Sequence, residues 1–291
     1  MASAVRKALN IALVQMKVTA NKATNLQVAR EKVLAAGQNG ADVVVLPECF
    51  NSPYGVQHFE QYAEPIEGTA PGESIRALSA MAKDAQVYLV GGTIPEVPQR
   101  QLYNTCPIFN RAGHLLATHR KVHLFDIDVP GKMTFRESSV LHAGNHLTQF
   151  TTEWGPIGVG ICYDLRFPEM AMIAARRGCI AMIYPAAFNI TTGPVFFELL
   201  QRARAVDNLF FVATCSPARA DPEAIRNEGV YPAWGHSSVV GPVGEVIATC
   251  DHEDTTVVAQ LDLDRLDEAR RFYPIYQQRR FDLYPDVAQG L

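Results

Sequence analysis

Gly158-Val-Gly-Ile-Cys162-Tyr-Asp-Leu-Arg-Phe-Pro-Glu169 is the stretch that decides the fold of this 291-residue chain. It opens as an apolar strand, and Pro168 suits the first turn of a helix, where its missing N–H is not needed. The two glycines let the backbone approach its neighbours closely. Cys162 is therefore predicted on a turn from strand to helix, with the Tyr163 backbone N–H free to face a developing oxyanion.

Short apolar strands and amphipathic helices alternate along the rest of the chain. The pattern predicts strands at 10–16, 42–47, 86–93, 156–162, 179–184, 209–215 and 255–262, helices at 24–36, 73–84, 168–178, 195–207 and from Asp264, and paired strands at 103–110 with 114–121 and 236–241 with 245–250. The stretch 122–147 has little regular pattern, and loops of that length usually carry function. No repeat or linker interrupts the pattern.

These elements predict one α/β domain over residues 1–291, with mixed sheets and helices on the outer faces. Its core is expected from about residue 8 to 270. The tail, about 271–291, is rich in tyrosine and arginine and could dock on a partner subunit.

Composition excludes several classes of protein. A hydrophobic content of 48% with 19% charged residues is typical of a globular protein with a large core. The net charge of −4 and the lack of a basic run argue against nucleic acid or an anionic membrane as partner. No apolar run is long enough to span a membrane, and no secretory signal pattern opens the chain. We therefore expect a cytoplasmic protein; a short mitochondrial signal stays open.

The cysteine and histidine spacings predict neither a disulfide framework nor a metal site. None of the six cysteines forms a C-x-x-C pair, and the eight histidines show no H-E-x-x-H or H-x-H pattern. Most of the thiols are expected to be small buried hydrophobes.

Three residues with reactive side chains follow predicted strands. Glu48 follows the apolar run 43–47, Lys121 follows 115–120, and Cys162 follows 157–161. A carboxylate at the tip of a buried strand needs a partner charge or hydrogen bonds. A cysteine near a cation has a lowered pKa and can act as a thiolate nucleophile. Together they predict acyl transfer through a thioester.

Each of these residues also has an ordinary structural interpretation. Cys162 could be a buried structural cysteine, Glu48 could cap the following turn, and Lys121 could lie on a solvated basic edge. Glu137, by itself, is typical of a surface residue.

The combination resembles the nitrilase superfamily of carbon–nitrogen hydrolases, from about residue 8 to 285. Its Glu–Lys–Cys triad matches Leu46-Pro-Glu48, Arg120-Lys-Val-His123 and Gly160-Ile-Cys-Tyr-Asp164, in the same chain order and with spacings of 73 and 41 residues. A second family glutamate, which supports the lysine, falls on Glu137. The resemblance implies a four-layer α-β-β-α sandwich that dimerises through helix faces, so a homodimer is expected.

Within this superfamily the chain is most similar to the Nit2-type ω-amidases. The supporting runs are 121–132, 184–189, 191–194, 199–208 and 233–237. The resemblance implies hydrolysis of the terminal amide of short dicarboxylic acid monoamides, such as 2-oxoglutaramate and 2-oxosuccinamate, without a metal or cofactor. Glu48 would be the general base, Lys121 and the Tyr163 N–H would hold the oxyanion, and Glu137 would orient Lys121.

Such a substrate needs a cation for its distant carboxylate, preferably an arginine. The candidates are Arg166, Arg202, Arg204, Arg219 and Lys132. Arg166 and Arg204 could equally pair with Asp164 or Glu169. Tyr54, Phe188 and Thr191 are predicted to line the substrate pocket, with core packing as the alternative for the two aromatic residues.

Other functions stay open. The nearest is an amidase of the same superfamily with another substrate, such as deaminated glutathione, or a nitrile hydrolase. A non-enzymatic binding scaffold on the same fold is a second alternative. A thiol redox sensor would need a resolving cysteine, for which Cys49 is the candidate.

Overall fold

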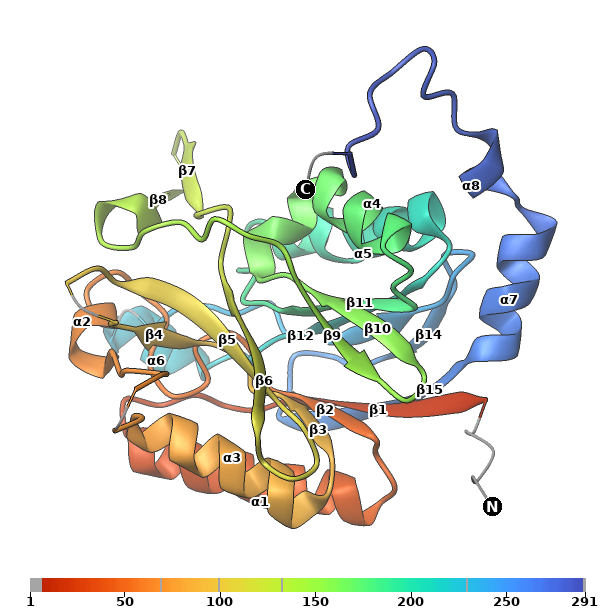
Figure 1. The fold of residues 1–291 in the computed structure, drawn as a ribbon. Helices are drawn as coiled ribbons and strands as arrows, with labels where there is room; N and C mark the ends of the chain where they lie inside the picture. Colours follow the sequence, from red (N-terminus) through yellow and green to blue (C-terminus); the bar gives the residue numbers. More distant parts are fainter. Residues whose placement is uncertain (1–6, 69, 99, 132, 229, 290–291) are drawn as a thin grey trace.

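The computed structural model describes residues 7–289 except 69, 99, 132 and 229. Two β-sheets pack face to face, and helices cover their outer faces (Figure 1). This is the α-β-β-α sandwich implied by the resemblance. No helix among the described residues is both long and apolar enough to cross a membrane.

The first sheet has seven strands in the order β15-β1-β2-β3-β5-β4, with β6 paired to β5. Its strands are β1 (Ala8–Gln15), β2 (Val43–Val45), β3 (Tyr88–Val90), β4 (Ile94–Glu96), β5 (Tyr103–Phe109), β6 (Leu115–Arg120) and β15 (Thr255–Asp262). Strands β1, β2 and β3 are parallel, so their carboxyl ends lie at one edge of the sheet.

The second sheet has six strands in the order β14-β13-β12-β11-β10-β9. Its strands are β9 (Thr148–Thr152), β10 (Gly155–Val159), β11 (Ala181–Pro185), β12 (Phe211–Cys215), β13 (Ser238–Val240) and β14 (Val246–Thr249). The central strands β10, β11 and β12 are parallel.

Helices α1 and α3 cover the first sheet, and α4 and α5 cover the second (Figure 1). The helices are α1 (Lys22–Gln38), α2 (Phe59–Tyr62), α3 (Glu73–Ala85), α4 (Pro168–Arg176), α5 (Gly193–Asn208), α6 (Pro222–Glu228), α7 (Leu263–Phe272) and α8 (Ile275–Gln278). Two short 3-10 helices, η1 (Glu137–Ser139) and η2 (Cys162–Arg166), follow strands directly or nearly so.

Apolar side chains fill the spaces between the layers of the sandwich, and two of these spaces flank strand β2. One lies between the sheets and includes Ile11, Val45, Ile157 and Ile183. The other lies between the first sheet and its helices and includes Val44, Leu78 and Met81. Neighbours in β2 therefore face different layers, which explains why all of Val43–Val45 is buried.

Most predicted elements are confirmed, but the stretch 122–147 is more ordered than its sequence suggests. It contains a small two-stranded sheet, β7 (Asp126–Val129) with β8 (Met133–Arg136), followed by η1. Side chains of these strands alternate between exposed and half-buried. This hairpin lies outside both main sheets and carries Glu137 at its end. Strands β4 and β9 and helices α2, α6 and α8 were not predicted from the sequence either.

Candidate active site

Glu48, Lys121 and Cys162 come from both sheets of the sandwich. Glu48 follows β2 and Lys121 follows β6, both in the first sheet, whereas Cys162 follows β10 in the second. Glu48 and Lys121 are 0% exposed and Cys162 is 4% exposed. The residues that the sequence analysis singled out are thus brought to one buried location.

Lys121 lies between two carboxylates. Its Nζ donates to Glu48 Oε1 and to Glu137 Oε1, both at 2.9 Å. Burial alone would lower the pKa of Lys121, but Glu137 and Glu48 raise it well above its ordinary value. The side chain is therefore a fully buried ammonium ion.

Glu137 is held by its own hydrogen bonds. Tyr54 donates its hydroxyl to Oε1 at 2.8 Å, and the Phe125 backbone N–H donates to Oε2 at 2.7 Å. The side chain of Glu137 is fully buried, although its sequence context is typical of a surface residue. Because η1 closes back on the segment after Lys121, this glutamate is fixed against the ammonium.

Glu48 has one occupied and one free oxygen. Asn104 on β5 donates to Oε1 at 2.8 Å, beside the Lys121 contact. Oε2 is buried and makes no hydrogen bond of ordinary geometry with the described residues. The thiol of Cys162 is still near enough to influence the pKa of Glu48. Oε2 is therefore available to accept the thiol proton.

The backbone around Cys162 is fixed in an unusual conformation. Cys162 has φ +44°, a left-handed conformation that side chains other than glycine rarely adopt. At Gly160, a Cβ atom would come within 2.6 Å of the Tyr184 ring, so only glycine fits there. The Ala187 N–H donates to Cys162 Sγ at 3.5 Å. Tyr163 lies in the first turn of η2, where backbone N–H groups lack helical partners.

The pKa values describe a resting thiol. Burial and the Glu48 charge raise the pKa of Cys162 well above its usual range, outweighing Lys121 and the Ala187 N–H. The expectation of a lowered thiol pKa was therefore wrong, because desolvation disfavours the thiolate more than the ammonium favours it. Burial also raises the pKa of Glu48; the Lys121 charge offsets part of this shift, and Glu137 adds to it. Attack by sulfur thus needs proton transfer to a nearby base.

Asp164 is a buried carboxylate that the sequence analysis did not single out. It lies between His119 and His123, the residues two positions before and after Lys121. Burial would raise the pKa of Asp164, but hydrogen bonds from both histidines and from the Ile161 N–H lower it well below its ordinary value. Its place two residues after Cys162 was the available signal.

Among the candidate cations that the structure describes, Arg166 is the one not committed elsewhere. Its side chain is half-buried among aromatic rings, with the guanidinium carbon 4.1 Å from the centre of the Phe196 ring and 5.5 Å from that of Tyr163. Its Nε is buried without a hydrogen-bond partner, and no ion pair to Arg166 occurs among the described residues. Burial lowers the pKa of this guanidinium, which arginine's high ordinary value nonetheless keeps charged. It shares a small cavity with Cys162.

The other candidate arginines, Arg202, Arg204 and Arg219, have structural partners. Arg204 donates to the carbonyl oxygens of Leu165 and Arg166, Arg202 to that of Gly244, and Arg219 to those of Ala233 and Trp234. Lys132 lies outside the described residues. The pairing of Arg204 or Arg166 with Asp164 or Glu169 is not seen, since the carboxylate of Asp164 is taken by the two histidines.

The predicted pocket residues lie in different positions. Phe188 is buried and lines the small cavity beside Cys162 and Arg166, together with Thr192 rather than Thr191. The Thr191 backbone N–H instead donates to Asn189 Oδ1 at 2.9 Å. Tyr54 supports Glu137 and packs against Tyr231, with ring centres 4.5 Å apart. Tyr231 was missed; it lines both cavities described here.

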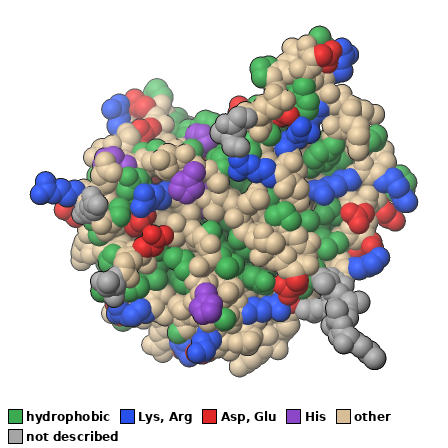
Figure 2. Space-filling view, viewed as in Figure 1, with side chains coloured by type: hydrophobic (Ala, Val, Ile, Leu, Met, Phe, Trp, Pro, Cys, Tyr) green, Lys and Arg blue, Asp and Glu red, His purple; other side chains and the backbone are tan. Residues whose placement is uncertain are grey.

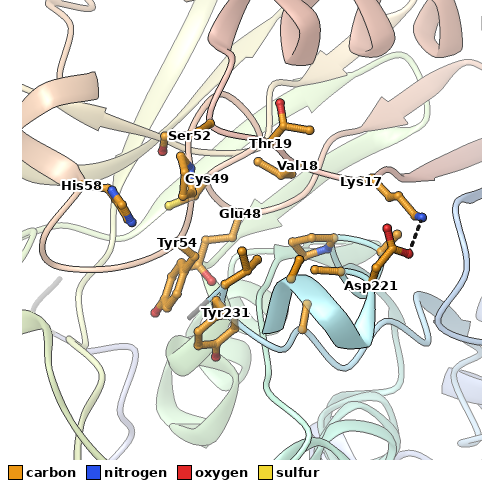
Figure 3. A pocket seen from close by; sticks show the side chains of 18 residues that line it. Lys17, Val18, Thr19, Glu48, Cys49, Ser52, Tyr54, His58, Asp221 and Tyr231 are labelled. Carbon is orange, nitrogen blue, oxygen red and sulfur yellow. Dashed lines mark hydrogen bonds and ion pairs between the residues drawn. The ribbon is translucent and has the colours of Figure 1, made fainter. Parts of the chain in front are cut away.

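A larger cavity of about 350 Å³ lies on the other side of Glu48. Figure 3 shows Glu48 with Cys49 and Ser52 on one side and the Lys17–Asp221 ion pair at a distance. By contrast, the cavity beside Cys162 and Arg166 measures only about 10 Å³. The catalytic side chains thus lie between a small cavity and a larger one.

Metal coordination has no obvious location within the part of the chain that the structure describes. No group of three or more His, Cys, Asp or Glu side chains there could hold a metal ion. Basic and acidic side chains are interspersed around the face drawn in Figure 2, with no large area of one sign.

Comparisons with known proteins agree in their result. A family model described as carbon-nitrogen hydrolase matches residues 10–271. The chain is 56% identical over 285 residues to a Schizosaccharomyces pombe protein described as a hydrolase, covering 98% of this chain and 86% of that one. It is 52% identical over 274 residues to the omega-amidase NIT2 of Mus musculus, covering 94% and 96% of the two chains. The structure is similar to that of Saccharomyces cerevisiae Nit3, described as a member of branch 10 of the nitrilase superfamily, with a TM-score of 0.85 and 42% identity over 96% of this chain and all of that one.

Proposed function

The chain belongs to the carbon–nitrogen hydrolase family of the nitrilase superfamily, a hydrolase acting on amide C–N bonds, and from this premise we propose that it is an ω-amidase. Its substrates are short dicarboxylic acid monoamides such as 2-oxoglutaramate and 2-oxosuccinamate. The observation that carries the proposal is the buried ammonium of Lys121, held by Glu48 and Glu137 beside the Cys162 thiol.

The reaction begins with attack of Cys162 sulfur on the amide carbon, while Glu48 Oε2 takes the thiol proton. Lys121 and the Tyr163 N–H stabilise the negative oxygen that forms, and a single such donor typically contributes ~3–4 kcal/mol. Glu48 then gives the proton to the amide nitrogen, ammonia leaves, and a thioester forms. Water activated by Glu48 hydrolyses this thioester.

The distant carboxylate of the substrate is bound by Arg166. This arginine shares a cavity with Cys162, and its Nε has no partner in the part of the chain that the structure describes, so an anion there would satisfy a buried donor. A cavity of about 10 Å³ cannot hold a five-carbon acid. Binding therefore requires movement of Arg166 or Phe188, which line it.

The activity is tested by ammonia release from 2-oxoglutaramate, with deaminated glutathione and a nitrile as competing substrates. We expect turnover of 2-oxoglutaramate, and none by Cys162→Ala. A strong preference for deaminated glutathione would overturn the substrate, and unchanged hydrolysis by Cys162→Ala would overturn the mechanism. A trapped acyl group on Cys162, found by mass spectrometry, would be the expected intermediate.

The role of Arg166 is tested by Arg166→Lys and Arg166→Gln. We expect KM for 2-oxoglutaramate to rise about tenfold or more in Arg166→Gln, the effect of losing a charge-assisted pair of ~1.5–3 kcal/mol, with partial recovery in Arg166→Lys. Lys17→Gln is the matched control, because Lys17 lies at the larger cavity. A KM that rises with Lys17→Gln and not with Arg166→Gln would assign the carboxylate to that cavity instead.

A homodimer formed through helix faces is part of the same proposal. Val195, Leu199 and Val206 on α5 are 58%, 62% and 46% exposed, an unusual cluster on one helix. Leu199→Glu is expected to shift the protein to a monomer in light scattering; a wild-type monomer would contradict the proposal.

All six cysteines are free, as is usual in a reducing compartment, which supports the cytoplasm as location.

A further inference from the structure

The cavity on the Glu48 side is too large for the leaving group of a primary amide. It measures about 350 Å³, within the ~300–1,000 Å³ usual for small-molecule sites. Ammonia is close in size to a water molecule, whose share of liquid volume is ~30 Å³. Most of this space therefore has no occupant in the reaction proposed above.

The proposed mechanism determines which end of the substrate meets this cavity. Glu48 must return its proton to the amide nitrogen, so that nitrogen lies within hydrogen-bond reach of the Glu48 carboxylate. Glu48 lines the large cavity, whereas Cys162 and Arg166 line the small one. A group attached to the nitrogen thus extends into the large cavity, while the acyl chain lies on the Arg166 side.

Two aromatic side chains separate the two spaces. Tyr231 lines both cavities and packs against Tyr54, which lines the larger one. The Tyr231 hydroxyl donates to the Ala187 carbonyl oxygen at 2.6 Å, which fixes the ring. The acyl and amine ends of a substrate therefore meet distinct surroundings.

The walls of the large cavity indicate the chemistry of its occupant. They are built mainly from small apolar side chains, among them Val18, Ala20, Ala218, Ala220 and Ala224. The cation at its outer edge, Lys17, is already paired with Asp221 at 3.0 Å, and both side chains are solvent-exposed. Ser52 contributes a buried hydroxyl that has no hydrogen-bond partner among the described residues. Such walls suit an uncharged, short alkyl group.

We propose that this enzyme also hydrolyses secondary ω-amides whose nitrogen carries a small uncharged alkyl group. The inference rests on the proposed function and extends its substrate class. The S–C bond to Cys162 forms and the C–N bond breaks, and the nitrogen keeps the electron pair and receives its proton from Glu48. Water then cleaves the thioester. One amide and one water yield one carboxylate and one alkylammonium ion.

The test compares 2-oxoglutaramate with its N-ethyl derivative, following formation of the common product 2-oxoglutarate. We expect the two kcat/KM values to agree within about tenfold, since the ethyl group enters existing space. Ala220→Leu and Ala224→Leu, each half-buried and lining the cavity, should lower kcat/KM for the N-ethyl amide ~10–200-fold, the usual effect of hydrocarbon that no longer fits. Both should leave the primary amide unchanged.

Arg226→Leu is the matched control. Arg226 lies on helix α6, as Ala224 does, but it is exposed and does not line the cavity. Turnover of 2-oxoglutaramate with no turnover of its N-ethyl derivative would overturn this inference and leave the proposed function standing. Equal losses on both substrates in the leucine variants would overturn the assignment of the cavity to the amine. Failure with both substrates in the wild-type enzyme would remove the proposed function as well.

Discussion

Asp164 Oδ1 lies 2.9 Å from the backbone nitrogen of His123 and 2.8 Å from its ring Nδ1. The other oxygen, Oδ2, lies 3.3 Å from His119 Nε2. Asp164, two positions after Cys162, thus binds His119 and His123, which lie two positions before and after Lys121. Since Cys162 and Lys121 belong to different sheets, Asp164 links the nucleophile to the ammonium.

Asp164→Asn should lower kcat more than it changes KM, because it loosens the position of Lys121 relative to Cys162 without removing a group that binds substrate. A hydrogen bond to a buried charge contributes ~1.5–3 kcal/mol, so the free energy of unfolding should fall by at least that amount. Asp207→Asn, at an exposed carboxylate on α5, is the matched control. Steady-state kinetics and urea unfolding measure both effects.

The difference in stability between wild type and Asp164→Asn should depend on pH, because the pKa of Asp164 is lowered. The ionised form favours folding at pH values above the ordinary aspartate pKa, ~3.9. This contribution is lost as pH falls below that value toward the lower pKa of the folded state. The stability gap between wild type and Asp164→Asn should therefore narrow from pH 5 to pH 3; a constant gap would contradict the role of Asp164.

Lys121→Met should abolish hydrolysis and destabilise the protein, because two buried carboxylates lose their counter-ion. Removing one partner of a buried ion pair usually costs ~3–5 kcal/mol. In the variant, burial and the nearby Glu137 charge keep the pKa of Glu48 raised in the folded state, and the Lys121 charge that opposed this shift is gone. A raised carboxyl pKa favours folding at low pH, so the variant should regain stability relative to wild type as pH falls from 7 to 5. Urea unfolding at pH 7 and pH 5 checks this. A stability difference between variant and wild type that is larger at pH 5 would contradict the role of Lys121 as the counter-ion of the two carboxylates.

Alkylation of Cys162 should be slow at neutral pH and accelerate above the ordinary cysteine range, since its pKa is raised. Glu48→Gln removes a negative charge that contributes to this shift, so the variant should react faster than wild type at the same pH. Peptide mass spectrometry after iodoacetamide treatment distinguishes Cys162 from the equally buried Cys49. Fast alkylation of Cys162 at pH 7 would indicate a resting thiolate instead.

Tyr54→Phe should reduce kcat roughly 10–100-fold, the effect of losing a hydrogen bond of ~1.5–3 kcal/mol to a charged group. Its hydroxyl donates to the same Glu137 oxygen that accepts from Lys121. Tyr231→Phe is the matched control, because its hydroxyl donates to a backbone carbonyl and not to Glu137. Equal losses of kcat in the two variants would mean that the hydroxyl of Tyr54 has no particular role in holding Glu137.

The sequence predicted the layers of this protein better than the details of its site. Glu48, Lys121 and Cys162 each follow a strand. Strands β2 and β6 run in the same direction, so Glu48 and Lys121 lie at one edge of the first sheet, and the packing of the two sheets brings Cys162 to them. Asn104 carries no comparable signal. It lies inside β5 and meets Glu48 only because β5 and β2 flank β3 in the same sheet.

The direction of the Cys162 pKa shift also depends on the fold. The neighbouring Lys121 and Glu48 could be inferred from the sequence, but not that burial would outweigh the ammonium charge. The hairpin β7–β8 was missed for a different reason. Its strands do alternate polar and apolar residues, but each is only four residues long, the shortest run in which alternation indicates a strand.

The division of the reacting groups between two sheets has a consequence for how this protein loses activity. The sulfur depends on one sheet and its proton acceptor on the other, so a slip of the two layers by less than an ångström misaligns them while leaving every strand intact. Heating or mild denaturant should therefore abolish activity before any spectroscopic change in the backbone appears. Activity would then be the most sensitive measure of how the two sheets pack against each other.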